Sequence, residues 1–192
     1  MKTVGCVIPC YRGNELTLDI IKKAIKIVDY LVLVDDSCPN KTGELASKNI
    51  KDENFILIRN ESNKGVGAAV KKGINYLLSI DCDIIVKVDA DGQIDPLLIP
   101  EIIQPLLKNN ADAVKGNRFT SVENILSMPF LRLLGNLGLS FLNKVSSGYW
   151  ELFDPTNGFI AFSSESLKEI DLQKTDDRFF FETDLLFRCS LK

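Results

Sequence analysis

Short apolar runs alternate with amphipathic segments through about the first 118 residues, and this alternation is the feature that most restricts how the chain can fold. The apolar runs are nearly continuous, which is typical of strands covered on both faces of a parallel sheet. The amphipathic segments carry apolar residues at helical spacing, so each is expected to cross between strands as a helix. The expected strands are residues 3–9, 30–36, 55–60, 83–91 and 111–118, and the expected helices are residues 14–28, 41–50, 66–80 and 96–110, the last broken by prolines. We therefore predict a three-layer α/β/α fold with a mostly parallel central sheet.

The alternation of strand-like and helical segments becomes irregular after about residue 119. Residues 157–163 could form one late strand, and residues 178–192 have a helical pattern that stops in mid-course. We interpret residues 1–192 as a single domain in two halves, a nucleotide-type half (1–118) and an elaborating half (119–192). The interrupted helical pattern leads us to expect that the sequence is truncated at its C-terminus.

The composition excludes several kinds of site. The chain contains no histidine, which excludes Ser/His/Asp triads, Cys/His catalysis and His-ligated metals. Proton transfer and metal binding would then depend on carboxylates, whose oxygens favour Mg²⁺ or Mn²⁺. A net charge of −3 gives no basic excess for binding nucleic acid. The five cysteines, an odd number without a CxxC pair, are expected to be reduced thiols of a cytosolic protein, and no apolar run approaches the ~20 residues that a membrane span needs.

Two aspartates one residue apart, Asp89 and Asp91, close the expected fourth strand. Ligands of open α/β sheets bind outside the carboxyl ends of the strands. Residues i and i+2 of an extended segment project to the same side, so the two carboxylates could converge on one divalent cation, with water and a diphosphate completing its coordination. Gln93 offers a further oxygen, and Gly92 would let the backbone approach a ligand. The alternative is an Asp-Gly turn that caps the helix beginning near Pro96.

A second acidic pair, Asp35 and Asp36, ends the expected second strand. These carboxylates could accept hydrogen bonds from a nucleobase or a ribose. They could equally form the turn and helix cap that aspartate favours after a strand, and the motif by itself leaves both roles open.

The glycines after the third expected strand do not indicate a dinucleotide site. Gly65 and Gly67 are followed by Val70 where the fingerprint needs glycine or alanine, and they do not follow the first strand. A GxxxxGK[ST] motif is also absent, which excludes P-loop chemistry. We interpret these glycines as a turn that opens a helix.

Seven segments of the chain, taken together, are more specific than any one motif. They are VIPCYRGNE, LVLVDDS, NKGVGAAVKKGI, VKVDADGQIDP, VKGNRF, DPTNGF and FFFETDLLFR. In residues and in order they resemble family 2 glycosyltransferases of the GT-A fold, and most of all the branch with dolichol-phosphate mannose synthases and bacterial polyprenyl-phosphate glycosyltransferases. The chain departs from the usual pattern in two places: the acid of the first motif is displaced to Glu15, and Ser37-Cys38 stands where Gly-Ser is usual.

The resemblance implies that residues 1–118 are the nucleotide-sugar-binding half and residues 119–192 the acceptor-side half, and it implies roles for the matching residues. The pair at the end of the fourth strand would hold the metal and the diphosphate, and the residues after the first two strands would hold the base and ribose. Arg118 would lie near the diphosphate or the acceptor, and Asp154 near the transferred sugar. The implied metal ligands are Asp89, Asp91 and Gln93; the implied catalytic carboxylates are Asp154, Glu182 and Asp184; the implied nucleotide-sugar contacts are Pro9, Tyr11, Glu15, Asp35, Asp36, Gly65, Asp89, Ala90, Asp91 and Arg118.

These roles imply a metal-dependent, inverting hexosyltransferase that uses a UDP- or GDP-sugar with Mg²⁺ or Mn²⁺. The acceptor would be a polyprenyl or dolichyl phosphate, or a cell-surface glycan precursor. An acceptor hydroxyl would need a carboxylate as general base, whereas a lipid phosphate is already anionic. One alternative is a sugar-1-phosphate nucleotidyltransferase, which would be expected to carry a glycine-rich basic loop where this chain has PCYRGNE. The other is a non-catalytic nucleotide-sugar-binding module.

Residues 125–145 bear on the acceptor. Their glycines, and the basic Arg132 and Lys144 among apolar residues, fit either a core helix or an interfacial segment that meets a membrane. Under the second interpretation the protein makes a peripheral membrane contact and works at the cytoplasmic face of the membrane, in the biogenesis of the cell envelope.

Overall fold

A six-stranded sheet forms the centre of the structure, a computed structural model that describes residues 2–117, 135, 138, 144 and 157–190. The strands are β1 (Val4–Cys10), β2 (Tyr30–Asp35), β3 (Phe55–Arg59), β4 (Ile84–Lys87), β5 (Ala113–Lys115) and β6 (Ile160–Ser163). Their order is β3-β2-β1-β4-β6-β5, with β1 to β4 parallel and β6 antiparallel to both of its neighbours. The predicted mostly parallel sheet is confirmed.

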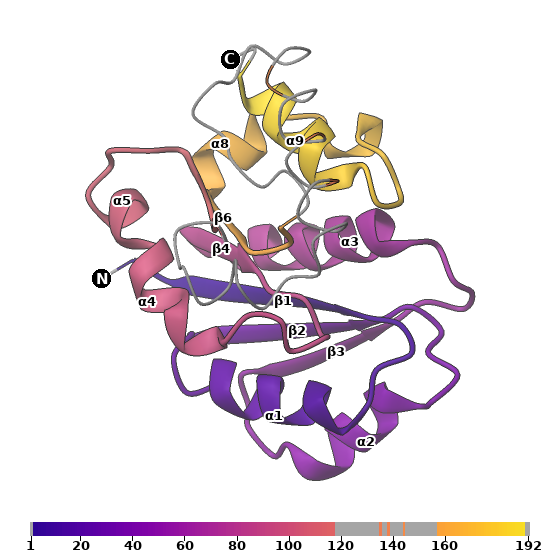
Figure 1. Cartoon of the computed structure of the whole chain (residues 1–192). Helices are drawn as coiled ribbons and strands as arrows, with labels where there is room; N and C mark the ends of the chain where they lie inside the picture. Colours follow the sequence, from indigo (N-terminus) through magenta and orange to yellow (C-terminus); the bar gives the residue numbers. More distant parts are fainter. Residues whose placement is uncertain (1, 118–134, 136–137, 139–143, 145–156, 191–192) are drawn as a thin grey trace.

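Helices cover both faces of this sheet, which gives the three layers expected from the sequence (Figure 1). The helices are α1 (Glu15–Ala24), α2 (Thr42–Asn49), α3 (Val66–Ser79), α4 (Ile99–Ile102), α5 (Gln104–Leu107), α8 (Ser164–Lys168) and α9 (Phe181–Ser190), with short 3-10 turns η1 (Pro96–Leu98) and η3 (Leu172–Lys174). Strand alternation separates the two faces: Cys6 and Ile8 of β1 pack on the side of α1, and Val7 between them packs on the side of α3 and α9. Within the described ranges, no helix is long and apolar enough to cross a membrane.

The helical segment over residues 96–110 is divided at its prolines, as expected. Pro96 opens η1, while Pro100 and Pro105 stand in the first turns of α4 and α5. Proline has no N–H to donate and its ring blocks the preceding turn, so it is tolerated only where a helix begins. Leu106 of α5 still reaches the core on the side of α1.

The late strand β6 lies inside the sheet, between β4 and β5. Ala161 of β6 pairs with Val86 of β4 on one side and with Val114 of β5 on the other. Consequently β4 is hydrogen-bonded along both edges, and all four of its residues are buried. The later part of the chain thus completes the sheet that the first part begins.

The fourth strand ends at Lys87, earlier than the expected span of residues 83–91. One further backbone bond, from Val88 N–H to Val7 O at 3.0 Å, extends the pairing, and the chain then turns at residues 90 and 91. The two aspartates after β4 therefore do not lie along one extended strand, and their carboxylates have different surroundings.

Candidate active site

The carboxyl ends of β1, β2 and β4 meet at one edge of the sheet, and the side chains that follow them form the candidate site. The strand register pairs Cys10 with Asp35, so the loops after β1 and β2 begin side by side. Asn14 and Thr17 form a capping box at the start of α1. Thr17 Oγ1 also donates to Ala90 O at 3.1 Å, which joins this helix start to the turn after β4.

Asp36 is buried, and most of its carboxylate is engaged by the chain itself. Oδ1 accepts hydrogen bonds from Asn60 Nδ2 at 2.7 Å and from Lys64 N–H at 2.9 Å, and Oδ2 accepts one from Gly65 N–H at 2.9 Å. These bonds tie the turn before α3 to the end of β2. Because a carboxylate has about four acceptor positions, about one remains for a ligand.

Asp35, the last residue of β2, is also buried. Its Oδ1 accepts a hydrogen bond from Cys38 N–H at 2.7 Å, and Arg59 Nε lies 4.0 Å from Oδ2. The side chain fits because residue 43 is glycine, where an added Cβ would overlap Asp35 Oδ2. Asp35 therefore shapes the turn after β2, which is one of the two roles that the sequence left open.

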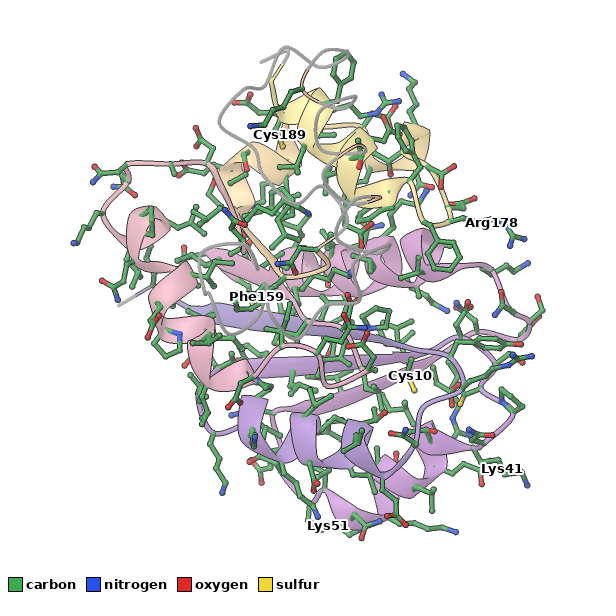
Figure 2. The ribbon with its side chains drawn as sticks, in the orientation of Figure 1. Cys10, Lys41, Lys51, Phe159, Arg178 and Cys189 are labelled. Atoms are coloured by element: carbon green, nitrogen blue, oxygen red, sulfur yellow. The ribbon has the colours of Figure 1, made fainter. Side chains whose placement is uncertain are left out.

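Two buried thiols, Cys10 at the end of β1 and Cys38 in the turn after β2, lie near each other (Figure 2 labels Cys10). Burial raises the pKa of Cys10 to about 12, and the neighbouring Cys38 and Asp35 add to the shift. Burial also acts to raise the pKa of Cys38, but hydrogen bonds from Thr42 and nearby backbone groups outweigh it and lower that pKa. All five cysteines are free thiols, as expected, and Cys38 ionises before Cys10.

Pro9, Tyr11 and Glu15 surround the end of β1. Pro9 is buried in the strand opposite Val34, while Glu15 is exposed as the first residue of α1. The Tyr11 ring is 46% exposed, and the guanidinium of Arg12 lies 5.5 Å from its centroid. An exposed aromatic ring at this edge can stack on a flat ligand such as a nucleobase.

Lys87, the last residue of β4, brings a positive charge to the edge of the sheet where the aspartates after β2 and β4 lie, which we call the acidic edge. Its side chain is 3% exposed, and its Nζ lies 2.7 Å from Asp89 Oδ1 and 2.5 Å from Glu182 Oε1. Burial would lower the pKa of Lys87, but the charges of Asp89 and Glu182 and the hydrogen bonds to them outweigh it, and the pKa is raised. Lys87 is therefore an ammonium that joins β4 to α9. We call Lys87, Asp89 and Glu182 the lysine triad.

The lysine triad fits because residue 158 has no side chain. A Cβ at Gly158 would overlap Asp89 Oδ2 and would lie 2.6 Å from Lys87 Nζ. The chain beside it is held by Asn157, whose Oδ1 accepts a hydrogen bond from Phe159 N–H at 3.0 Å; Phe159 lies near the centre of the molecule in Figure 2. The segment that leads into β6 thus lies directly against Asp89 and Lys87.

Asp91, in contrast to Asp89, is exposed. Its Oδ1 accepts a hydrogen bond from Gln93 N–H at 3.0 Å. Gly92 between them has a φ of 78°, in the left-handed region that glycine adopts without strain. One backbone N–H occupies only one of about four acceptor positions, so this carboxylate retains the capacity to bind a cation.

The donor atoms at this edge fit a divalent cation held by a single carboxylate. Among the described residues, no three His, Cys, Asp or Glu side chains are placed to hold a metal ion together. Mg²⁺ needs no such cage, since it is often bound by one or two carboxylates, with water and substrate phosphates as the other ligands. Asp91 suits that donor set. Asp89 is paired with Lys87 through Oδ1, and its role as a metal ligand stays a prediction. The role of Gln93 as a further ligand stays a prediction.

The two late acids, Glu182 and Asp184, both lie in the first turn of α9, and both have partners. Glu182 belongs to the lysine triad. Asp184 Oδ1 accepts a hydrogen bond from Arg188 Nε, and Oδ2 accepts one from Asp176 N–H, each at 2.9 Å. These bonds occupy one acceptor position of Glu182 and two of Asp184, so each carboxylate keeps positions at which it could accept a proton.

The loop before α9 packs on the first turn of α3. Ala68 N–H donates to Asp177 O at 3.0 Å, and Lys71 Nζ lies 2.5 Å from Asp177 Oδ1. At Gly65, which has a φ of 101°, and at Gly67, the space of a side chain is taken by carbonyl groups of this loop. The predicted glycine turn does open a helix, and its glycines admit the chain that leads to α9.

Two predicted site residues, Arg118 and Asp154, and most of residues 125–145 lie outside the described part of the chain, so their roles stay predictions. The structure adds two residues that the sequence analysis missed, Lys87 and Gly158. A signal for Lys87 was available, because a lone charge inside a buried strand needs a partner. For Gly158 the sequence offered only its place within DPTNGF.

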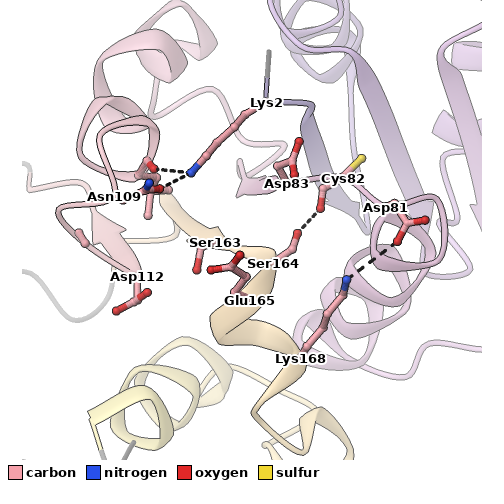
Figure 3. A pocket seen from close by; sticks show the side chains of 12 residues that line it. Lys2, Asp81, Cys82, Asp83, Asn109, Asp112, Ser163, Ser164, Glu165 and Lys168 are labelled. Atoms are coloured by element: carbon pink, nitrogen blue, oxygen red, sulfur yellow. Dashed lines mark hydrogen bonds and ion pairs between the residues drawn. The ribbon is translucent and has the colours of Figure 1, made fainter.

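A cavity of about 360 Å³ lies at the opposite edge of the sheet, where β1 and β4 begin (Figure 3). Several of its polar groups bind one another: Lys2 Nζ donates to Leu106 O at 3.0 Å, and Lys168 Nζ lies 3.9 Å from Asp81 Oδ1. None of the described site residues lines this cavity, so it is separate from the acidic edge.

The sequence profile of a family described as glycosyl transferase family 2 matches residues 6–171. A UDP-N-acetylglucosamine–dolichyl-phosphate N-acetylglucosaminyltransferase of Methanococcus voltae is 29% identical in an alignment 192 residues long, gaps included. The alignment covers 93% of this chain and 76% of the relative. An undecaprenyl-phosphate mannosyltransferase of Micrococcus luteus is 29% identical over 189 residues, which cover 96% of this chain and 76% of the relative.

Among solved structures, the chain is similar to glucosyl-3-phosphoglycerate synthase from Mycobacterium tuberculosis in complex with Mn²⁺, uridine diphosphate and phosphoglyceric acid. The TM-score is 0.67 at 21% identity, and the match covers 96% of this chain. It covers 63% of the synthase chain, so this chain spans less than two thirds of that protein's length. At this identity the likeness shows the fold alone, and it confirms the predicted GT-A arrangement.

Proposed function

Because this chain belongs to glycosyl transferase family 2, we propose that it transfers a hexosyl group from a UDP- or GDP-sugar to a polyprenyl or dolichyl phosphate. The observation that carries the proposal is the acidic edge, where the exposed Asp91 follows β4 and the buried Asp36 follows β2. In an open α/β sheet this edge is where a ligand binds.

The donor fits the groups that remain available at this edge. The exposed ring of Tyr11 offers a stacking surface for the base, and Asp36 keeps about one acceptor position for a hydroxyl. Support also comes from the relatives: the Methanococcus voltae enzyme has a UDP-sugar in its name, and the synthase structure contains uridine diphosphate with Mn²⁺.

Mg²⁺ or Mn²⁺ bound at Asp91 would stabilise the negative charge that develops on the departing nucleotide diphosphate. In the transfer, an acceptor oxygen forms a bond to the anomeric carbon while the bond from that carbon to the diphosphate oxygen breaks. Attack from the face opposite the leaving group inverts the anomeric configuration. The chain's own part is to orient the donor and to exclude competing geometries.

A phosphate acceptor is favoured over a hydroxyl acceptor by its chemistry and by the names of the relatives. A hydroxyl needs a general base within hydrogen-bond reach. Glu182 and Asp184 keep acceptor positions for that role beside their bonds to Lys87 and Arg188. A lipid phosphate is anionic at neutral pH and needs no such base, and both relatives described above are named for lipid-phosphate acceptors.

The proposal includes a peripheral contact with the cytoplasmic face of a membrane, where a lipid-linked acceptor would be reached. Just before α9, Phe179 is 90% exposed and Phe180 is 61% exposed. Arg178 beside them is exposed as well and extends away from the molecule (Figure 2). Exposed aromatic side chains next to a basic one suit the boundary between lipid headgroups and acyl chains.

A donor screen followed by a transfer assay tests the function. Thermal unfolding of the chain is measured with a panel of UDP- and GDP-sugars, with and without Mn²⁺, because a bound ligand raises the unfolding temperature by mass action. We expect one donor class to stabilise the protein only with Mn²⁺, and its sugar to appear on undecaprenyl or dolichyl phosphate in detergent micelles.

Other outcomes of the same assays identify the alternatives. Donor binding without transfer to any lipid or glycan acceptor would indicate a binding module. Formation of a nucleotide-sugar from a sugar 1-phosphate and a nucleoside triphosphate, with release of pyrophosphate, would indicate a nucleotidyltransferase.

A further inference from the structure

We propose that Lys87 is a positioning residue for sugar transfer: its buried ammonium holds Asp89 of the turn after β4 and Glu182 of α9 at one point, so that this part of the site is assembled before a ligand binds. The inference rests on the proposed function and assigns a role to a residue that lies behind the groups facing the donor.

The backbone fixes Lys87 from both sides. In the sheet it pairs with Val7 of β1 and with Ile160 of β6. Ile85, two residues earlier, packs in the core on the side of α3 and α9, so alternation directs the Lys87 side chain to the same face. The ammonium is therefore held on a central strand, where neither neighbour can move without breaking the sheet.

Charge balance explains why the lysine triad holds together. Asp89 and Glu182 would repel each other at this spacing, and a buried ammonium without partners would be unfavourable. The side chains of Lys87, Asp89 and Glu182 are 3%, 32% and 13% exposed, so solvent does little to screen these contacts. One cation between two carboxylates leaves a net charge of −1, in a space that Gly158 keeps open.

The two aspartates after β4 consequently have different tasks. Asp89 is turned to Lys87, while Asp91 is exposed and has acceptor capacity for a cation. Lys87 contacts neither Asp91 nor Asp36 in any described interaction. Loss of the ammonium should therefore leave donor binding nearly intact. It should lower turnover, because the inference assigns Asp89 and Glu182 to the orientation of the reacting sugar.

A second buried lysine provides the matched control. Lys71 of α3 has a side chain that is 8% exposed, lies 2.5 Å from Asp177 Oδ1, and donates to Thr175 O at 2.9 Å. It also ties a helix to the chain before α9, but it touches none of the site carboxylates. Replacing Lys71 with methionine measures what the loss of a buried lysine costs when only structure is affected.

The experiment compares Lys87→Met, Lys87→Arg and Lys71→Met in the whole chain. Donor affinity is measured by calorimetry with Mn²⁺, using the donor found in the screen, and turnover by transfer to the lipid phosphate. For Lys87→Met we expect kcat to fall about 100-fold, the scale of a misplacement near 1 Å, while the donor Kd changes less than about threefold. Lys87→Arg should recover part of kcat, because it restores the charge in a different geometry. Lys71→Met should keep kcat within about threefold of the parent.

A double-mutant cycle tests whether Lys87 acts through Glu182. Glu182→Gln alone should lower kcat, since an amide oxygen accepts a weaker hydrogen bond from the ammonium. If both residues act through one contact, the double variant Lys87→Met/Glu182→Gln will be within about threefold of Lys87→Met. If the two losses multiply, the residues act separately and the inference is wrong.

Two further results would overturn the inference: kcat of Lys87→Met close to that of the parent, or a loss of donor affinity as large as the loss of turnover. If Lys87→Met does not fold, Glu182→Gln decides, and an unchanged kcat in that variant refutes the role. A parent protein that neither binds nor transfers any sugar contradicts the proposed function itself, which is a different result from an active parent with an equally active Lys87→Met.

Discussion

At the scale of single side chains, the acids at the edge of the sheet differ more in their partners than in their positions. Asp36 accepts three hydrogen bonds from the chain, Asp89 is paired with a lysine, and Asp91 accepts a backbone bond in a turn. Of these three, Asp91 is exposed, Asp89 is half-buried and Asp36 is buried. Burial and partners thus leave these carboxylates with different capacities to bind a ligand, and Asp91 has the largest.

The first prediction concerns Asp91→Asn. Asparagine keeps an oxygen for the Gln93 N–H, so the fold should remain, while the loss of the charge should remove Mn²⁺-dependent stabilisation by the donor. Asp52→Asn is a matched control, because Asp52 is also exposed and accepts a hydrogen bond from the N–H two residues on, at the other edge of the sheet. Thermal unfolding with and without donor and Mn²⁺ provides the measurement. Equal donor shifts in the parent and in Asp91→Asn would contradict the prediction.

The second prediction concerns Cys6, whose side chain is 0% exposed and whose pKa burial raises from 9.0 to about 12. Above pH 9 the unfolded chain loses this proton while the native state keeps it, so unfolding releases a proton and the free energy of unfolding falls as pH rises. The slope from this thiol is at most about 1.4 kcal/mol per pH unit. In Cys6→Ala that contribution is absent, so urea unfolding from about pH 8 to 11 should give a shallower decline than in the parent. Parallel curves for the two proteins would show that Cys6 does not contribute in this way.

At the scale of elements, α3 and α9 approach closely because small residues stand at the start of α3. An added Cβ at Gly67 would overlap Asp176 O and would lie 2.8 Å from the Cβ of Phe181 in α9. Phe181 and Leu185 are buried in the core that α3 covers. The position of α9, and with it that of Glu182, therefore depends on a glycine more than 100 residues earlier in the chain.

The third prediction is that Gly67→Ala destabilises the protein. Alanine would favour the helix by about 1 kcal/mol, but forcing a methyl group into a filled space costs about 1–3 kcal/mol, and here it meets backbone that has little room to move. Hydrogen exchange should report reduced protection in α9. Gly135→Ala is the control, since an added Cβ there meets no atom within 4 Å. Unchanged protection of α9 in Gly67→Ala would mean that the loop shifts without cost.

Local pattern is enough to predict β1 to β4 and the helices between them, because each depends on spacing within about a dozen residues. The place of β6 between β4 and β5 is not in the local pattern, since Ile160 pairs with Lys87 far away in the chain. The same holds for the site: the acids after β2 and β4 are visible as motifs, but the partner of Asp89 is fixed only when α9 packs on the sheet. In the sequence alone, Lys87 is one charge in an apolar run, and its partners are defined only by the packing of α9.

At the scale of the whole molecule, large apolar side chains are exposed at several places among the described residues. Phe179 and Phe180 are an adjacent pair just before α9, Leu97 and Leu98 are a second pair in η1, and Leu45 lies on α2 on the opposite face of the sheet (Figure 1). The pair before α9 adjoins the basic Arg178, a combination that suits contact with a lipid surface.

The fourth prediction is that Phe179→Ser/Phe180→Ser weakens binding to vesicles that contain anionic lipid, while donor binding in solution is retained. Two exposed phenylalanines contribute apolar area to an interface, and neither is one of the carboxylates proposed to bind the donor. Leu45→Ser serves as the control and should leave vesicle binding unchanged. Co-sedimentation with vesicles measures the effect, and equal binding by both variants would place the membrane contact elsewhere.

The antiparallel strand β6 has a consequence for how the gene product can be divided. A fragment that ended before residue 157 would leave β4 and β5 with a missing strand between them, and so with two facing rows of unsatisfied amide and carbonyl groups. Such a fragment would be prone to aggregate, because its unpaired strand edges can form hydrogen bonds with other chains. The complementary C-terminal peptide, added in trans, would be the natural strand to restore solubility, much as split reporter proteins are rebuilt from their parts.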